Sequence, residues 1–216
     1  MEKYLSAFSS AATKIGNAAK KTSENYSDKL IPDEPAFTAA LTTRIMDSLG
    51  GYSKSGISWQ SKILTSSGPN TEEKIYGADL LGVLELDLPD FKIKKGFLAQ
   101  AKRQEPGKKL SAKEWERLIN QCTKMLGYTS ESYVFIYSLN GVFIVPALSI
   151  LGTQKVEDLH TLHPKRIQAF YKEHFMCFVG DSRLKHTEPY ILEELRIPRM
   201  LSIVGSTTEV ERDLFD

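Results

Sequence analysis

Three polar side chains that suit a metal-assisted reaction lie at the ends of two apolar segments. Asp79 lies near the start of residues 78–88, and Gln100 and Lys102 close residues 93–102. A carboxylate and a carboxamide supply the oxygen ligands that Mg²⁺ prefers. An ammonium group nearby can stabilise negative charge on a reacting phosphate. The three side chains together predict phosphodiester hydrolysis, provided that the fold brings them to one place.

The two segments are predicted to form an antiparallel hairpin that does so. Leucines alternate with acidic residues at 84–88, which is typical of a strand, and Pro89-Asp90 predicts a turn. Paired positions in an antiparallel hairpin have a constant sum, so this turn pairs residue 79 with residue 100. Lys102 shares the face of Gln100 because side chains alternate along a strand. Gly77 allows a close backbone approach just before this point.

The local charge is consistent with a polyanionic substrate. The chain has a net charge of only +1, but residues 92–113 carry a single acid, Glu105, among eight cations. Such a run attracts phosphates. Besides Lys102, the predicted nucleic-acid-binding residues are Lys92, Lys94, Lys95, Arg103, Lys108, Lys109 and Lys113.

These residues carry a resemblance to a known superfamily. The stretches GADLLGV (77–83) and GFLAQAKR (96–103) resemble the G-x-D and Q-x-K elements of restriction-endonuclease-like PD-(D/E)xK nucleases, in the QxK variant of Mrr-type restriction enzymes. The resemblance covers about residues 33–147. Two features depart from the usual motif: alanine precedes Asp79, and a carboxamide replaces the second acid.

The resemblance implies a role for each matching position. Asp79 would be the metal-binding carboxylate, Gln100 would coordinate through its amide oxygen, and the carbonyl of Ala101 would add a ligand. Lys102 would orient or help to deprotonate the attacking water and stabilise the transition state.

Many members of the superfamily also place a glutamate from the first helix at the metal. Glu34 is the candidate for this metal-binding and catalytic role, since it precedes the apolar stripe of Phe37 and Leu41. A helix-dipole partner is the alternative explanation for Glu34. Glu72 and Glu73, just upstream of Asp79, are the rival candidates.

The predicted fold is α/β, with a restriction-endonuclease-like three-layer α/β/α core, a mixed central sheet, an N-terminal helix and C-terminal helical additions. Alternating helices and strands, with tight turns such as Asn140-Gly141, favour this class. Residues 31–150 form the predicted nuclease core, and 151–216 a C-terminal extension packed on it. Residues 1–30 are a helical extension whose narrow apolar seam packs on the body, a second copy or a partner.

We therefore expect an Mg²⁺- or Mn²⁺-dependent endonuclease acting on double-stranded DNA. The resemblance implies a setting in restriction or antiviral defence. It also implies a homo-oligomer, or a subunit of a complex with an ATPase or sensor protein, because one site cuts one strand. The sequence has no long apolar segment, no signal-peptide core and only two cysteines, so a cytoplasmic location without membrane contact is expected.

Three alternatives remain open at this stage. The same fold and basic run would also suit a non-catalytic module that binds nucleic acid or protein. An RNA-cleaving toxin could use the same scaffold. At the level of the residues, Asp79 and Lys102 could simply form a salt bridge at an exposed strand end.

Overall fold

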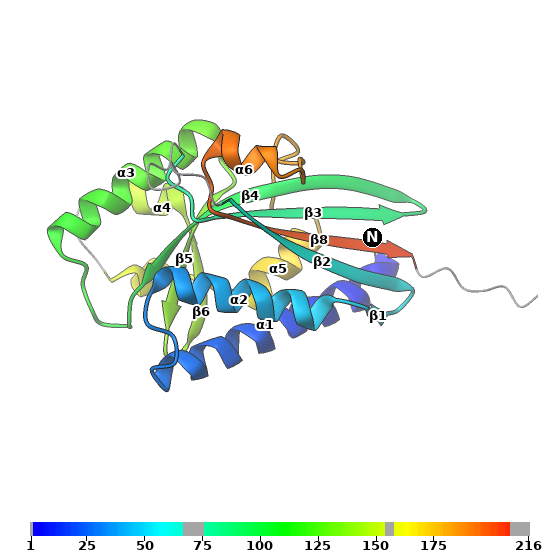
Figure 1. Ribbon diagram of the computed structural model, residues 1–216, viewed down its shortest axis with the longest axis horizontal. Helices are drawn as coiled ribbons and strands as arrows, with labels where there is room; N and C mark the ends of the chain where they lie inside the picture. Colours follow the sequence, from blue (N-terminus) through cyan, green and yellow to red (C-terminus); the bar gives the residue numbers. More distant parts are fainter. Residues whose placement is uncertain (1, 67–75, 154–157, 208–216) are drawn as a thin grey trace, which may run out of the picture.

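The computed structural model describes residues 2–66, 76–153 and 158–207, and its centre is one mixed β-sheet (Figure 1). Eight strands of the described chain lie in the order β1-β2-β8-β3-β4-β5-β6-β7. The β3–β8 and β4–β5 pairs are parallel, and the other pairs are antiparallel. The strands are β1 (Tyr52–Lys54), β2 (Ile57–Thr65), β3 (Leu80–Leu88), β4 (Phe91–Arg103), β5 (Ser132–Ser138), β6 (Gly141–Pro146), β7 (Lys165–Arg166) and β8 (Arg199–Thr207).

Helices cover both faces of this sheet, as the sequence predicted. One buried cluster joins a sheet face to α1, α2 and α5, and a second joins the other face to α3, α4 and α6. The chain is therefore a three-layer α/β protein with a mixed sheet. The helices are α1 (Leu5–Ser27), α2 (Glu34–Leu49), α3 (Ala112–Tyr128), α4 (Ala147–Leu151), α5 (Ile167–Phe175) and α6 (Tyr190–Leu195). In the described ranges, no helix combines the length and apolarity needed to cross a membrane.

The β3–β4 hairpin has the predicted register. Leu88 pairs with Phe91 across the turn, and Leu80 pairs with Ala99 at the open end. Each pair has the same sum as 79 and 100, so the turn at Pro89-Asp90 sets the register of the hairpin. Because β4 continues to Arg103, its last residues extend beyond the start of β3.

Helix α1 packs on the body of the chain, the first of the three alternatives for its seam. Phe8 and Ile15 are fully buried, and Phe8 contacts the rings of Trp59 and Phe175. Gly16 lies close to α5, because a Cβ there would come within 3.1 Å of Gln168. The apolar seam is therefore used inside the chain.

The prediction of C-terminal helical additions is wrong for the last element. Residues 188–204 look helical in sequence, but only Tyr190–Leu195 is helix, and Arg199–Thr207 is the central strand β8. Met200 packs on the α3 side, and Leu201 and Ile203 on the α2 side. A strand buried on both faces has a continuous apolar pattern that resembles a buried helix, which explains the error.

Candidate active site

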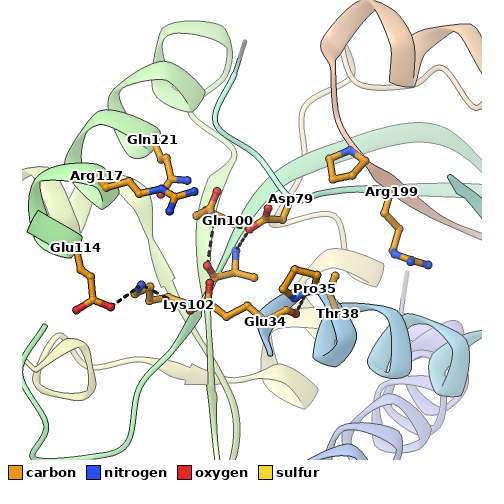
Figure 2. A pocket seen from close by; sticks show the side chains of 12 residues that line it. Glu34, Pro35, Thr38, Asp79, Gln100, Lys102, Glu114, Arg117, Gln121 and Arg199 are labelled. Atoms are coloured by element: carbon orange, nitrogen blue, oxygen red, sulfur yellow. Dashed lines mark hydrogen bonds and ion pairs between the residues drawn. The ribbon is translucent and has the colours of Figure 1, made fainter. Parts of the chain in front are cut away.

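A pocket of about 670 Å³ opens at the end of the sheet, between α2 and α3. It is lined by Asp79, by the last residues of β4, by the first turn of α2, by one face of α3 and by the start of β8. The residues predicted to do chemistry, Asp79, Gln100, Ala101, Lys102 and Glu34, all line this pocket (Figure 2).

Asp79 and the end of β4 form the centre of the pocket. The amide N–H of Ala101 donates to Asp79 Oδ2 at 2.8 Å, and the Nε2 of Gln100 donates to the same oxygen. Ala101 lies beyond the last β3 partner of β4, so its polar backbone groups are not used in the β3–β4 ladder. Its carbonyl oxygen instead accepts from Gln100 Nε2 at 2.9 Å. One carboxylate, one carboxamide and one backbone carbonyl therefore meet here.

The orientation of the Gln100 carboxamide provides a test of whether these groups suit a metal ion. Gln100 is 4% exposed, and its Oε1 is buried without a hydrogen-bond partner in the described chain. A buried acceptor without a partner is unfavourable. A half-turn of the amide would direct Oε1 toward the oxygens of Asp79 and Ala101. Three oxygens facing one point suit a hard divalent cation, so these groups fit Mg²⁺ or Mn²⁺.

Lys102 lies beside this centre and is held by two glutamates. Its side chain is 15% exposed, and Nζ lies 3.6 Å from Glu34 Oε1 and 3.4 Å from Glu114 Oε1. Lys102 thus directs its ammonium group to residues of α2 and α3 rather than to Asp79.

Glu34 stands at the start of α2, where Asp33 caps the helix and accepts from the N–H of Ala36 at 2.8 Å. Its Oε1 also accepts from the backbone N–H of Arg103 at 2.8 Å, which ties α2 to the end of β4. Within the described residues, no three His, Cys, Asp or Glu side chains form a metal-binding group. The rival residues Glu72 and Glu73 lie outside the described residues.

One face of α3 contributes three polar residues to the pocket. Glu114, Arg117 and Gln121 line the pocket and follow helical spacing. Glu114 also completes a capping box with Ser111, whose hydroxyl contact lowers the pKa of the Glu114 carboxyl. The helical spacing of the three residues is the sequence signal that could have found this face.

The loop before Asp79 packs directly on α3. Gly77 has φ +69°, and a Cβ there would lie 2.8 Å from the backbone of Gln121. Only glycine permits this approach without strain. The contact fixes the distance between α3 and the entry to β3, and it confirms the close backbone approach predicted at Gly77.

Arg199 completes the pocket and was also missed. It is the first residue of β8, next to the open end of β3, and lies on the α2 side of the site. No sequence signal pointed to it, because β8 itself was not predicted.

The predicted basic surface must be corrected at Lys95. This residue is 2% exposed, since it lies in the β4 row that faces the core, together with Phe97 and Ala99. Burial lowers the pKa of its ammonium group, and Lys95 cannot contact a phosphate at the surface.

Lys92 and Lys94 lie near the turn of the hairpin, where they pair with Asp87 and Glu85 at 2.7 and 3.1 Å. At about 3.3 Å per residue, Lys92 is roughly 33 Å along β4 from Lys102. The basic run therefore does not form one patch.

The other predicted basic residues lie near the end of β4. Arg103 donates to the Pro32 carbonyl at 2.9 Å and stacks over Tyr26. The remaining three, Lys108, Lys109 and Lys113, are exposed in the loop that follows β4 and in the first turn of α3.

No family model matches this chain, and comparisons with curated proteins and with solved structures found no significant match. The function must therefore be inferred from the geometry of the site.

Proposed function

We propose that the protein is a metal-dependent endonuclease of the restriction-endonuclease-like class, with the QxK form of the active site. The observation that supports this proposal is the meeting of Asp79, Gln100 and the Ala101 carbonyl in one pocket with Lys102. The α/β architecture and the mixed sheet are compatible with it.

Asp79, Gln100 and Ala101 would hold the Mg²⁺ or Mn²⁺ ion. When bound, the ion supplies positive charge at the scissile phosphate and favours a hydroxide nucleophile. To serve as a ligand, the Gln100 amide would present Oε1 in place of Nε2. Without the ion, Gln100 Nε2 donates hydrogen bonds to Asp79 Oδ2 and to the Ala101 carbonyl, which keeps Asp79 in place.

Lys102 would stabilise the charge that develops on the phosphate oxygens. Its ammonium group is positioned by ion pairs with Glu34 and Glu114, which leaves the Asp79 carboxylate to the metal ion. A preorganised cation in a partly enclosed pocket contributes to catalysis because it needs no reorganisation during the reaction.

The proposed substrate is double-stranded DNA, with the exposed lysines Lys108, Lys109 and Lys113 as backbone contacts. Because one site cleaves one strand, cutting a duplex calls for two copies of the chain or a partner complex. A role in antiviral restriction, in the cytoplasm and with an ATPase or sensor subunit, belongs to the same proposal.

The test is cleavage of supercoiled plasmid by the purified protein with Mg²⁺, with Mn²⁺ or with EDTA. We expect nicked or linear product only with the metals. Asp79→Asn should abolish the product. Asp87→Asn, near the far end of β3, is the matched control and should leave cleavage unchanged, since Asp87 pairs with the exposed Lys92 and lies far from the pocket.

Other outcomes of the cleavage assay would contradict the proposal or favour one of the alternative functions. Cleavage that persists in EDTA, or in the Asp79→Asn protein, contradicts the proposal. Cleavage of RNA with intact plasmid would favour the RNA-cleaving alternative. Binding of DNA without cleavage under any metal would favour the non-catalytic module.

A further inference from the structure

Two arginines of the pocket have no role in the proposed reaction. Arg117 projects from α3, and Arg199 from the start of β8. Figure 2 shows them on opposite sides of Asp79, Arg117 beside Gln121 and Arg199 on the α2 side. A ligand that spans the pocket from α3 to α2 would pass between them.

These arginines differ from Lys102 in their partners. Lys102 is balanced by Glu34 and Glu114. Within the described part of the chain, no ion pair joins Arg117 or Arg199 to a carboxylate. No carboxylate of the described chain therefore balances their charge, which suits them to bind an external anion.

Arg199 is the more informative of the two because it is half-buried. Burial lowers the pKa of its guanidinium group, and among the described residues only the hydroxyl of Tyr137 opposes this effect. An incompletely solvated cation without a counter-charge destabilises the folded protein. Residues that destabilise the free protein in this way are typical of binding sites, where the ligand supplies the missing partner.

We propose that Arg117 and Arg199 bind phosphates of one nucleic-acid strand on either side of the Asp79–Gln100 centre. The inference depends on the proposed function, whose substrate it specifies as an extended strand with a phosphate on each side of the cleaved bond. A guanidinium group suits this role because its planar donors match phosphate oxygens. The two arginines thus align the strand so that the intervening phosphate faces Lys102.

The test measures binding in EDTA, so that it is independent of cleavage. A fluorescent DNA duplex is titrated with wild-type protein and with Arg117→Gln, Arg199→Gln and the double variant over a series of salt concentrations. Each lost phosphate contact should reduce the slope of log K against log salt by about 0.7–0.9. Lys54→Gln, at the opposite end of the sheet, removes one charge without changing the slope.

Failure of the inference can be separated from failure of the proposed function. Wild-type protein that cleaves DNA, with an unchanged slope in the double variant, overturns only the inference. Wild-type protein that neither binds nor cleaves DNA overturns both. If the double variant binds a mononucleotide more weakly than the wild type does but binds the duplex equally well, the arginines bind a small phosphorylated ligand. That result would also contradict the proposal of an extended strand.

Thermal unfolding distinguishes a binding role for Arg199 from a structural one. Arg199→Met should unfold at a temperature equal to or above that of the wild type, because it removes a poorly solvated charge. A structural arginine would lower the temperature instead. If Arg199→Gln does not fold, Arg199→Met replaces it in the salt titration. A slope reduced by about 0.7–0.9 supports the phosphate contact, and a slope equal to that of the wild type overturns it.

Discussion

Replacement of Lys95 by methionine should stabilise the protein. Lys95 is 2% exposed, and its Nζ makes no well-formed hydrogen bond within the described chain. The Cys177 thiol and the Glu131 carboxylate offset its burial only in part, since the pKa of the ammonium group is still lowered. Gly180 closes over the aliphatic part of the side chain, since a Cβ there would lie 2.9 Å from Lys95 Cδ. Exchanging a buried ion for an apolar side chain of similar volume stabilises proteins by about 1–4 kcal/mol. At ~2–4 °C per kcal/mol for a chain of this size, Tm should rise by roughly 2–16 °C.

The gain should depend on pH in a defined direction. Burial lowers the pKa of Lys95 in the folded protein below the ordinary value of 10.5. Between the lowered pKa and 10.5, the unfolded chain binds a proton that the folded chain does not, so the wild type becomes more stable as pH rises. The advantage of Lys95→Met is therefore largest at low pH and shrinks as pH approaches 10.5. Calorimetric unfolding from pH 6 to pH 10 measures both effects.

Lys94→Met is the matched control in the same strand. Lys94 is partly exposed and pairs with Glu85 at 3.1 Å. Loss of such a surface pair changes stability by at most about 1 kcal/mol. A Lys95→Met protein that is less stable than the Lys94→Met protein would refute the reasoning, because it would mean that the buried ammonium group is well satisfied.

Four further predictions concern the site and the acid range. Gln100→Glu should lower Tm without metal, since it places a second carboxylate against Asp79, and should enlarge the Tm increase on adding Mn²⁺; an unchanged increase would exclude position 100 from the ion. Lys102→Ala should reduce kcat far more than DNA affinity, in single-turnover and binding assays; equal losses would make Lys102 only a phosphate contact. Charge reversal at Lys108 and Lys109 should flatten the salt dependence of DNA binding, and a constant slope would remove both lysines from the interface. Burial lowers the pKa of His174 to about 3, so stability should fall as pH drops below about 6.5 toward 3; His174→Gln should reduce this fall, and an identical pH profile would contradict it.

The centre of the site could be predicted because it depends on local geometry. A turn at Pro89-Asp90 and the alternation of strand residues were enough to bring Asp79 and Gln100 together. The pairing needs no information about the rest of the chain. The resemblance implied a glutamate from the first helix at the site, and the apolar stripe of that helix selected Glu34, which lines the pocket.

The errors concern residues whose position depends on distant parts of the chain. Lys95 appeared to belong to a basic run, but it lies in the buried row of β4 and is covered by the segment around Gly180. The position of Arg199 depends on β8, the last strand in sequence order, which lies between β2 and β3 in the sheet. The spacing of Ser111 and Glu114 in the sequence indicates a capping box, which the structure shows, but it does not indicate the contact of Glu114 with Lys102.

The most direct measurement of the central claim locates the ion. Fe²⁺ can be bound in place of Mg²⁺ and treated with ascorbate and peroxide, so that radicals cut the polypeptide next to the ion, and mass spectrometry identifies the cuts. We predict cuts near residues 79 and 100–101 that are suppressed by excess Mg²⁺ and absent from the Asp79→Asn protein. Cuts elsewhere in the chain, or the same cuts in Asp79→Asn, would contradict it.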